Sequence, residues 1–186
     1  MSAPPGPWTQ VYVGVGSNIE PEANIERALG LLARRTVLTG LSTFYRTAPV
    51  GPAGQPAFVN GVAGLRANLP ARELKFSVLR GIEADLGRKH SAANKYLPRP
   101  IDLDILLYGE LVSRAPELLI PDPDLWERPF LAAMLLELAP DVRFPGSRRP
   151  PCLKPGKRSR GNTRPLEAFS RRLREKFILR RSPDET

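Results

Sequence analysis

Residues 98–108 read PRPIDLDILLY, and this stretch decides how the rest of the chain is interpreted. It predicts a strand whose first half alternates charged and apolar side chains. Residues two apart in a strand share one face, so Asp102 and Asp104 are expected to project side by side. Leu103 and Ile105 then point the opposite way, into a core. The strand therefore carries two carboxylates on one face and apolar side chains on the other.

Two carboxylates on neighbouring positions of one face repel each other, which is costly without a cation. Mg²⁺ takes oxygen ligands, typically one or two carboxylates completed by waters and substrate phosphates. Asp102 and Asp104 are therefore candidate metal ligands, and Arg99, three residues before the pair, suits a polyphosphate substrate. The alternative is a pair of solvated acids on an edge strand, which the strand pattern alone leaves open.

Outward from this strand, the chain alternates predicted strands and helices. The order strand, helix, strand, strand, helix, strand, helix contains one hairpin. This order favours an α+β fold with a mostly antiparallel sheet covered by helices. Strands are predicted over 10–15, 37–47, 58–67 and 99–108, with a short one at 110–112, and helices are predicted over 22–35, 70–86 and 127–138.

The basic residues are unevenly distributed. The chain has 28 Lys and Arg against 19 Asp and Glu, of which 13 and 4 lie in residues 146–186, so the first 145 residues hold 15 of each. We therefore predict a neutral domain over 1–145 and a basic, Pro/Arg-rich C-terminal tail over 146–186 that is largely disordered. Within the tail, residues 165–179 can form a helix with Leu166, Phe169, Leu173 and Phe177 on one face.

Several classes of protein are excluded by what the sequence lacks. It has neither the P-loop nor the G-x-G-x-x-G pattern, so no standard glycine loop holds phosphates. Its one histidine, His90, makes a Ser-His-Asp triad or a His-ligated zinc site implausible. Its one cysteine rules out an internal disulfide, and no apolar run is long enough to span a bilayer. With no secretory pattern at the N-terminus, we expect a cytoplasmic protein without membrane contact.

Two further groups of residues have the chemistry of a binding site. Glu83 and Arg88 lead into a polar loop that carries more cations and Tyr96, which could close over a nucleotide or simply be a solvated loop. Phe58 and Asn60 share a strand face after a proline-rich loop, where they could stack on and hydrogen-bond a flat heterocycle. Equally, Phe58 could be a core residue and Asn60 a turn residue.

Four segments in their order and spacing resemble one enzyme family. They are VGVGSN, FYRTAPVGPAGQPAFVN, PRPIDLDILLYG and ERPFLAAMLLELAP, and the similarity to 6-hydroxymethyl-7,8-dihydropterin pyrophosphokinases covers about residues 11–145. The resemblance implies a ferredoxin-like α/β/α sandwich with helices on both faces of the sheet. It also implies a diphosphotransferase of folate biosynthesis that moves pyrophosphate from ATP to the pterin and releases AMP, using two Mg²⁺ ions. We expect a monomer.

The resemblance also assigns roles to particular residues. It makes Asp102 and Asp104 the magnesium ligands and Arg88 and Arg99 catalytic arginines. Glu83 and Arg128 match nucleotide-binding positions, and Tyr96 matches a loop aromatic near the substrates. The pterin pocket is assigned to Thr47, Val50, Phe58, Asn60 and Phe130, with the two phenylalanines on either side of the ring.

This chain departs from the family pattern at one position that bears on the nucleotide. Asp122 stands where the family commonly has a histidine, and a carboxylate would repel an ATP phosphate rather than donate to it. One alternative is therefore a nucleotide-binding relative without catalysis. Another is a nucleic-acid-binding module that uses the basic tail, although the strands lack the aromatic RNP1 pattern and the first 145 residues are neutral. Nucleic acid is expected to bind at most weakly, through the tail.

Overall fold

The computed structural model describes residues 7–49, 54–88, 97–146 and 163–179. Its elements in chain order are β1 (Thr9–Ser17), α1 (Pro21–Leu32), β2 (Val37–Leu41), β3 (Tyr45–Thr47), β4 (Phe58–Ala67), α2 (Ala71–Glu73), η1 (Leu74–Leu79), α3 (Arg80–Asp85), β5 (Asp102–Tyr108), β6 (Ser113–Ala115), β7 (Leu118–Ile120), α4 (Asp124–Glu127), α5 (Pro129–Leu138), β8 (Arg164–Pro165), α6 (Glu167–Arg174) and η3 (Glu175–Leu179). The predicted α+β class is confirmed.

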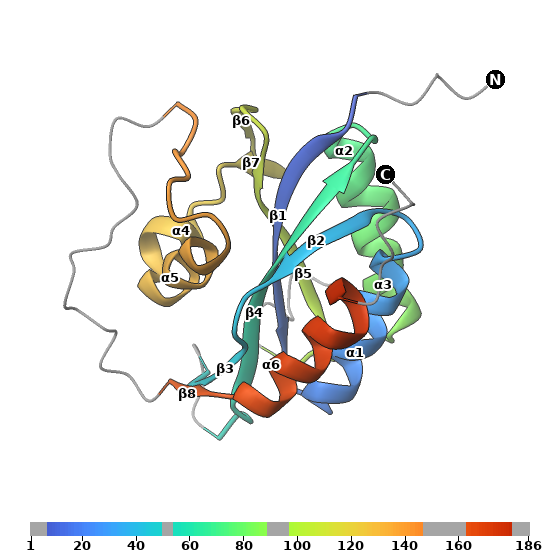
Figure 1. Cartoon of the computed structure of the whole chain (residues 1–186), viewed down its shortest axis with the longest axis vertical. Coiled ribbons are helices and arrows are strands. Elements are labelled where there is room, and N and C mark those ends of the chain that lie inside the picture. Colours follow the sequence, from blue (N-terminus) through green and yellow to red (C-terminus); the bar gives the residue numbers. More distant parts are fainter. Residues whose placement is uncertain (1–6, 50–53, 89–96, 147–162, 180–186) are drawn as a thin grey trace.

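The main sheet runs in the order β5-β1-β4-β3-β8, with β2 also paired to β4 (Figure 1). Every strand pair given for it is antiparallel. Strands β6 and β7 form a separate hairpin. The long central strands β1 and β4 pair along nine residues, from Thr9 opposite Ala67 to Ser17 opposite Val59. This pairing brings the polar end of β1 next to the start of β4, where the site lies.

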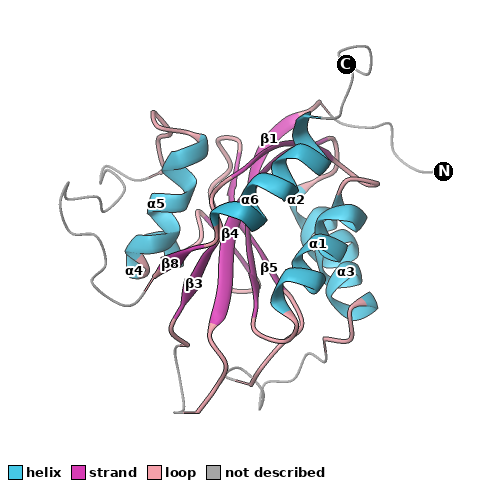
Figure 2. Cartoon of the chain, turned by 60° about the horizontal axis from the view of Figure 1, so that its bottom comes forward, coloured by secondary structure: helices cyan, strands magenta, loops and turns pink. Residues whose placement is uncertain are grey.

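Helices cover both faces of the sheet (Figure 2). On one face, α1, the continuous helix α2–η1–α3 and α6 bury a core with Val11, Val13 and Val15 of β1. On the other face, α4 and α5 pack on a smaller core that includes Leu106 of β5 and Val62 of β4. The alternation of side chains along each strand supplies both cores, as expected for a sheet that is buried on both sides.

The predicted single strand over 37–47 is wrong, because the chain breaks into β2 and β3. At the break, the side chain of Ser42 forms a hydrogen bond to the backbone of β4: its Oγ accepts the N–H of Val62 at 2.8 Å. The Phe44 ring packs directly on Gly61, and a Cβ atom added to Gly61 would come within 2.5 Å of that ring. The strand is therefore interrupted where the buried Phe44 ring packs on Gly61, and the sequence pattern alone does not reveal this packing.

Other boundaries differ for identifiable reasons. The helix predicted over 127–138 is confirmed from Pro129, which starts α5 at a position where proline is favoured. The helix predicted over 70–86 is confirmed as α2–η1–α3, but its middle turn, Leu74–Leu79, is π-helical. The short strand predicted at 110–112 is wrong, because pairing begins only at Ser113.

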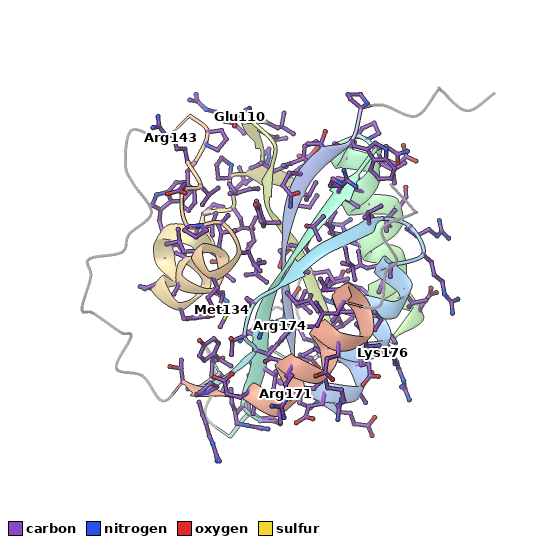
Figure 3. All side chains as sticks on the ribbon, viewed as in Figure 1. Glu110, Met134, Arg143, Arg171, Arg174 and Lys176 are labelled. Carbon is purple, nitrogen blue, oxygen red and sulfur yellow. The ribbon has the colours of Figure 1, made fainter. Side chains whose placement is uncertain are left out.

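Residues 163–179, here called the C-terminal segment, are a folded part of the predicted tail. Strand β8 pairs with β3, and the helix expected over 165–179 is present as α6 and η3. Phe169 and Leu173 are buried in the larger core, so the apolar stripe outweighs the basic composition. Arg174 reaches from α6 to the sheet, where its Nε donates to the Leu41 carbonyl at 2.8 Å (Figure 3). Tail residues 147–162 and 180–186 lie outside the described part.

None of the helices in the described part of the chain is both long enough and apolar enough to cross a lipid bilayer.

Candidate active site

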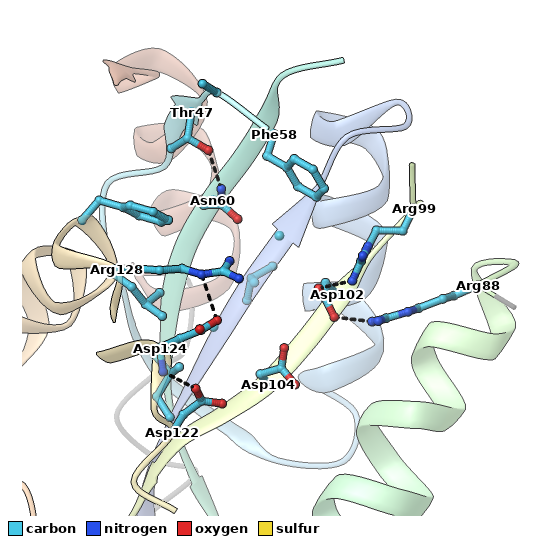
Figure 4. Close-up of a pocket in the computed structure, with 17 residues that line it drawn as sticks. Thr47, Phe58, Asn60, Arg88, Arg99, Asp102, Asp104, Asp122, Asp124 and Arg128 are labelled. Atoms are coloured by element: carbon cyan, nitrogen blue, oxygen red, sulfur yellow. Dashed lines mark hydrogen bonds and ion pairs between the residues drawn. The ribbon is translucent and has the colours of Figure 1, made fainter. Parts of the chain in front are cut away.

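A cleft of about 360 Å³ opens between the sheet and the α4–α5 layer. Its floor is the polar face of β5 with Gly14, Val15 and Gly16 of β1, and its walls come from β3, β4, α4 and α5 (Figure 4). Neighbouring side chains pack directly on the two glycines, Leu106 on Gly14 and Asn60 on Gly16. Leu106 and Leu131 give the cleft apolar lining. The cleft therefore combines charged groups with a partly apolar wall, as binding sites for small molecules commonly do.

Asp102 and Asp104 lie on the same face of β5, as predicted, and line this cleft. Asp102 is held by two arginines: its Oδ2 accepts from Arg99 at 2.8 Å, and its Oδ1 accepts from Arg88. Asp104 accepts from Lys75 at 2.6 Å. The repulsion expected between the two carboxylates is thus balanced by three cations of the chain itself.

Glu83 does not line the cleft but lies behind it. Its side chain is 2% exposed, and its Oε1 accepts from both Arg88 and the backbone N–H of Leu103, the latter at 2.8 Å. Burial raises the pKa of Glu83 to about 7, against the opposing effects of the Arg88 charge and the Leu103 hydrogen bond. Glu83 therefore fixes Arg88 and the middle of β5.

The electrostatic environments of the other carboxylates differ. Burial acts to raise the pKa of Asp104, but Lys75 and then Arg88 and Arg99 hold it below its usual value. At the start of α4, burial raises the pKa of Asp122 to about 7, and the negative charge of Asp104 adds to the rise. Asp122 Oδ1 also accepts the backbone N–H of Asp124, the first residue of α4, at 2.8 Å. Asp104 is therefore held as a carboxylate, whereas Asp122 titrates near neutral pH.

The wall formed by β3 and β4 has the groups for a flat, polar ring. Asn60 donates from Nδ2 to Thr47 Oγ1 at 2.7 Å. The Asn60 Oδ1 lies so close to Gly16 that a Cβ atom there would come within 2.6 Å of it. Phe58 and Phe130 line the same cleft from different layers. The sequence needs glycine at position 16 because the amide of Asn60 occupies the space of a side chain.

A third arginine borders the cleft. Arg128 lies between α4 and α5, and its Nε donates to Asp124 at 3.1 Å. Its side chain is half-exposed, so it can reach a bound anion without leaving this wall.

The structure thus gathers most of the predicted site residues in one cleft. Those that line it are Thr47, Phe58, Asn60, Arg88, Arg99, Asp102, Asp104, Arg128 and Phe130. Glu83 lies behind them, and Val50 and Tyr96 are outside the described residues. Sequence reasoning missed Asp124 and Lys75. Lys75 has no motif that could have flagged it, because it reaches Asp104 only through the packing of its helix against β5.

The donors in the cleft fit a magnesium ion carried with a polyphosphate. Among the described residues, no three or more His, Cys, Asp or Glu side chains form a cluster that could hold a metal ion by itself. Two carboxylates are nevertheless a usual protein share for Mg²⁺, which takes its remaining oxygens from water and phosphate. Asp102 and Asp104 offer that pair. The lysine and arginine side chains bonded to them show that this part of the cleft favours positive charge.

The family of 7,8-dihydro-6-hydroxymethylpterin-pyrophosphokinases matches residues 12–140 of this chain. The chain is similar to the 2-amino-4-hydroxy-6-hydroxymethyldihydropteridine pyrophosphokinase of Pseudomonas aeruginosa, with 42% identity over 145 residues that cover 76% of this chain and 88% of that protein. The protein of the same name from Haemophilus influenzae is 35% identical over 139 residues, covering 73% and 85%.

A plant protein is also similar. The mitochondrial folate synthesis bifunctional protein of Arabidopsis thaliana is 42% identical over 131 residues, which cover 69% of this chain but only 23% of that longer protein. The family match over residues 12–140 includes every residue that lines the cleft, and it ends before the C-terminal segment begins.

Proposed function

The chain belongs to the 7,8-dihydro-6-hydroxymethylpterin-pyrophosphokinase family, and from this premise we propose that its cleft is where pyrophosphate passes from ATP to 6-hydroxymethyl-7,8-dihydropterin. It is accordingly a pyrophosphokinase of folate biosynthesis. One observation carries the placement: Asp102 and Asp104 share a cleft with the aromatic and amide groups of the β3–β4 wall. Phosphate chemistry and recognition of a flat ring are therefore adjacent.

The pterin binds at the β3–β4 wall in this proposal. Phe58 and Phe130 stack on the two faces of the ring, and the Asn60 and Thr47 pair supplies hydrogen bonds to its polar edge. Val50 belongs to the same pocket by the family resemblance. The hydrogen bond between Asn60 and Thr47 pre-orients both groups, which lowers the ordering cost of binding.

The triphosphate lies toward β5. Asp102 and Asp104 would hold Mg²⁺, two ions by the family resemblance, and the metal would neutralise phosphate charge and favour ionisation of the attacking hydroxyl. In the reaction, the hydroxymethyl oxygen attacks the β-phosphorus of ATP, the bond from that phosphorus to the α-phosphate oxygen breaks, and AMP leaves. Such transfers depend mainly on positioning and charge stabilisation.

The arginines supply the remaining charge. Arg88 and Arg99 are both mostly buried and point at Asp102, so they are pre-positioned to receive negative charge that develops beside it. Glu83 orients Arg88 from behind and therefore acts on the nucleotide through that arginine rather than by direct contact. Arg128 binds the nucleotide from the α4–α5 side, and Tyr96 is a loop aromatic near the substrates by the family resemblance.

The proposal extends to the fold, the oligomeric state and the location of the protein. The sheet and its helices correspond to a ferredoxin-like α/β/α sandwich, and the protein works as a cytoplasmic monomer. Asp122, a carboxylate at the nucleotide side of the cleft, supports one competing function: a relative that binds nucleotide without transferring pyrophosphate.

Formation of AMP separates these two functions. Purified protein is incubated with ATP, Mg²⁺ and 6-hydroxymethyl-7,8-dihydropterin, and AMP, ADP and the pterin product are separated by chromatography, with each component omitted in turn. We expect AMP and pyrophosphorylated pterin in equal amounts only when all components are present. Nucleotide binding without AMP from folded protein would contradict the proposed catalysis and favour the inactive relative.

A further inference from the structure

Lys75 reaches Asp104, a lining residue of the active-site cleft, from the opposite helix layer. Strand β5 ends the sheet in the part of the chain that the structure describes, so one side of its backbone faces the helix α2–η1–α3. There Leu103, between the two aspartates, donates its N–H to Glu83 at 2.8 Å, and its carbonyl accepts from Lys75 Nζ at 3.0 Å. Two side chains of one helix thus take the place of a neighbouring strand.

The same ammonium group also binds the carboxylate that is proposed to hold metal. Lys75 Nζ lies 2.6 Å from Asp104 Oδ1, and the Lys75 side chain is only 14% exposed while that of Asp104 is 48% exposed. Arg88 and Arg99 pair with Asp102 instead. The Leu103 carbonyl of β5 therefore holds the Lys75 ammonium in place beside Asp104. Asp104 in turn lines the cleft.

We propose that Lys75 is a positioning residue that occupies Asp104 in the substrate-free protein and gives this carboxylate up to a divalent cation when the nucleotide arrives. The inference rests on the proposed function, because it takes Asp104 as a metal ligand. Its consequence is that the metal alone binds weakly, whereas the metal with nucleotide binds well.

The physical reason is competition between two cations for one carboxylate. An ammonium bonded to Asp104 neutralises the charge that attracts Mg²⁺ and repels the incoming ion. Triphosphate oxygens offer the three donors of Lys75 new acceptors, so the cost of leaving Asp104 falls when nucleotide is present. Because the ammonium also donates to the Leu103 carbonyl, it can leave Asp104 while staying beside β5, and it needs to move only locally.

The test is binding of Mn²⁺ without nucleotide, followed through the electron paramagnetic resonance signal of the free ion. In Lys75→Met the competing charge is gone, and we expect Mn²⁺ to bind about fivefold to tenfold more tightly than in the unaltered protein, equivalent to about 1 kcal/mol. With a non-reactive α,β-methylene ATP analogue, the gain in Mn²⁺ affinity caused by nucleotide should shrink by a similar factor. A purely structural role for Lys75 predicts the opposite, because a displaced Asp104 would bind Mn²⁺ more weakly.

Two further variants make the result specific. Arg72→Met removes a positive charge from the same helix, but Arg72 is exposed and pairs with Glu117 outside the cleft, so Mn²⁺ binding should not change. Lys75→Gln keeps a donor for the Leu103 carbonyl and should still bind Mn²⁺ more tightly. Unchanged or weaker Mn²⁺ binding in both Lys75 variants would overturn the proposal.

Asp104→Asn separates failure of the inference from failure of the proposed function. Loss of Mn²⁺ binding in Asp104→Asn, combined with no effect of the Lys75 variants, would reject the role of Lys75 alone. Unaltered Mn²⁺ binding in Asp104→Asn would instead reject Asp104 as a metal ligand, and with it the premise of the proposal.

Discussion

The cleft over β5 and the C-terminal segment use polar side chains for opposite purposes. In the cleft, Asp102 and Asp104 stay partly exposed and are bonded to cations. In the C-terminal segment, Ser170 is fully buried, and its Oγ accepts the backbone N–H of Phe44 at 2.9 Å. The exposed charges can exchange their partners for ligands, whereas the buried hydroxyl cannot. The difference predicts that substitutions in the first region affect turnover and substitutions in the second affect stability.

The largest effect is expected from the carboxylates of β5. Asp102→Ala or Asp104→Ala removes a proposed metal ligand, and AMP formation should fall by a factor on the order of a thousand or more. The free energy of unfolding is measured alongside by urea denaturation, because both carboxylates also pair with cations that are less than a fifth exposed. Full turnover in either variant with excess Mg²⁺ would show that the comparison assigns function to the wrong region.

In the C-terminal segment, Phe169→Ala should have the largest effect on stability. Phe169 is 5% exposed and meets Phe44 edge to face, with ring centroids 5.7 Å apart. The cavity should lower the free energy of unfolding by about 3–5 kcal/mol, measured by urea denaturation. Phe177→Ala, at a partly buried position of η3, is the matched control and should lose less. Reduced turnover at unchanged stability would contradict the distinction between the two regions.

Ser170→Ala sharpens the same comparison with a smaller change. It leaves the buried N–H of Phe44 without its acceptor, which should cost about 1–3 kcal/mol of stability. Ser77→Ala on the exposed side of η1 serves as the control and should be near neutral. Equal stabilities of the two variants would mean that the hydroxyl of Ser170 does not hold the β2–β3 break.

The smallest expected effect concerns pH. Because burial raises the pKa of Asp122 to about 7, this group is largely protonated below that pH and ionised above it. Its contribution to stability is therefore present at low pH and is lost as the pH rises through about 7. Ionisation also adds negative charge near the phosphates, so affinity for the α,β-methylene ATP analogue with Mg²⁺ should fall severalfold from pH 6 to pH 8.

Asp122→Asn keeps an acceptor for the Asp124 N–H and removes the titration. The ratio of wild-type to variant affinity should therefore change between pH 6 and pH 8, and this ratio cancels the titration of the nucleotide itself. A constant ratio would show that Asp122 does not sense the nucleotide.

The two regions also differ in how far the sequence predicts them. Period-two alternation places Asp102 and Asp104 on one face, and the relation of Phe58 to Asn60 follows in the same way, because strand geometry is local. Lys75 and the buried position of Glu83 depend on how a helix packs against the edge of β5, which no local pattern encodes. In the C-terminal segment, the apolar stripe of Phe169 and Leu173 predicts a helix, but the basic composition around it conceals that the helix joins the core.

The most direct test of the central claim is the position of the metal. Crystals grown with Mn²⁺, the α,β-methylene ATP analogue and the pterin substrate would locate the ion by its anomalous scattering. The account predicts Mn²⁺ bound to the carboxylates of Asp102 and Asp104, with Lys75 turned from Asp104 toward the phosphates. Mn²⁺ bound elsewhere in the cleft, for example between Asp122 and Asp124, with Lys75 still on Asp104, would contradict it.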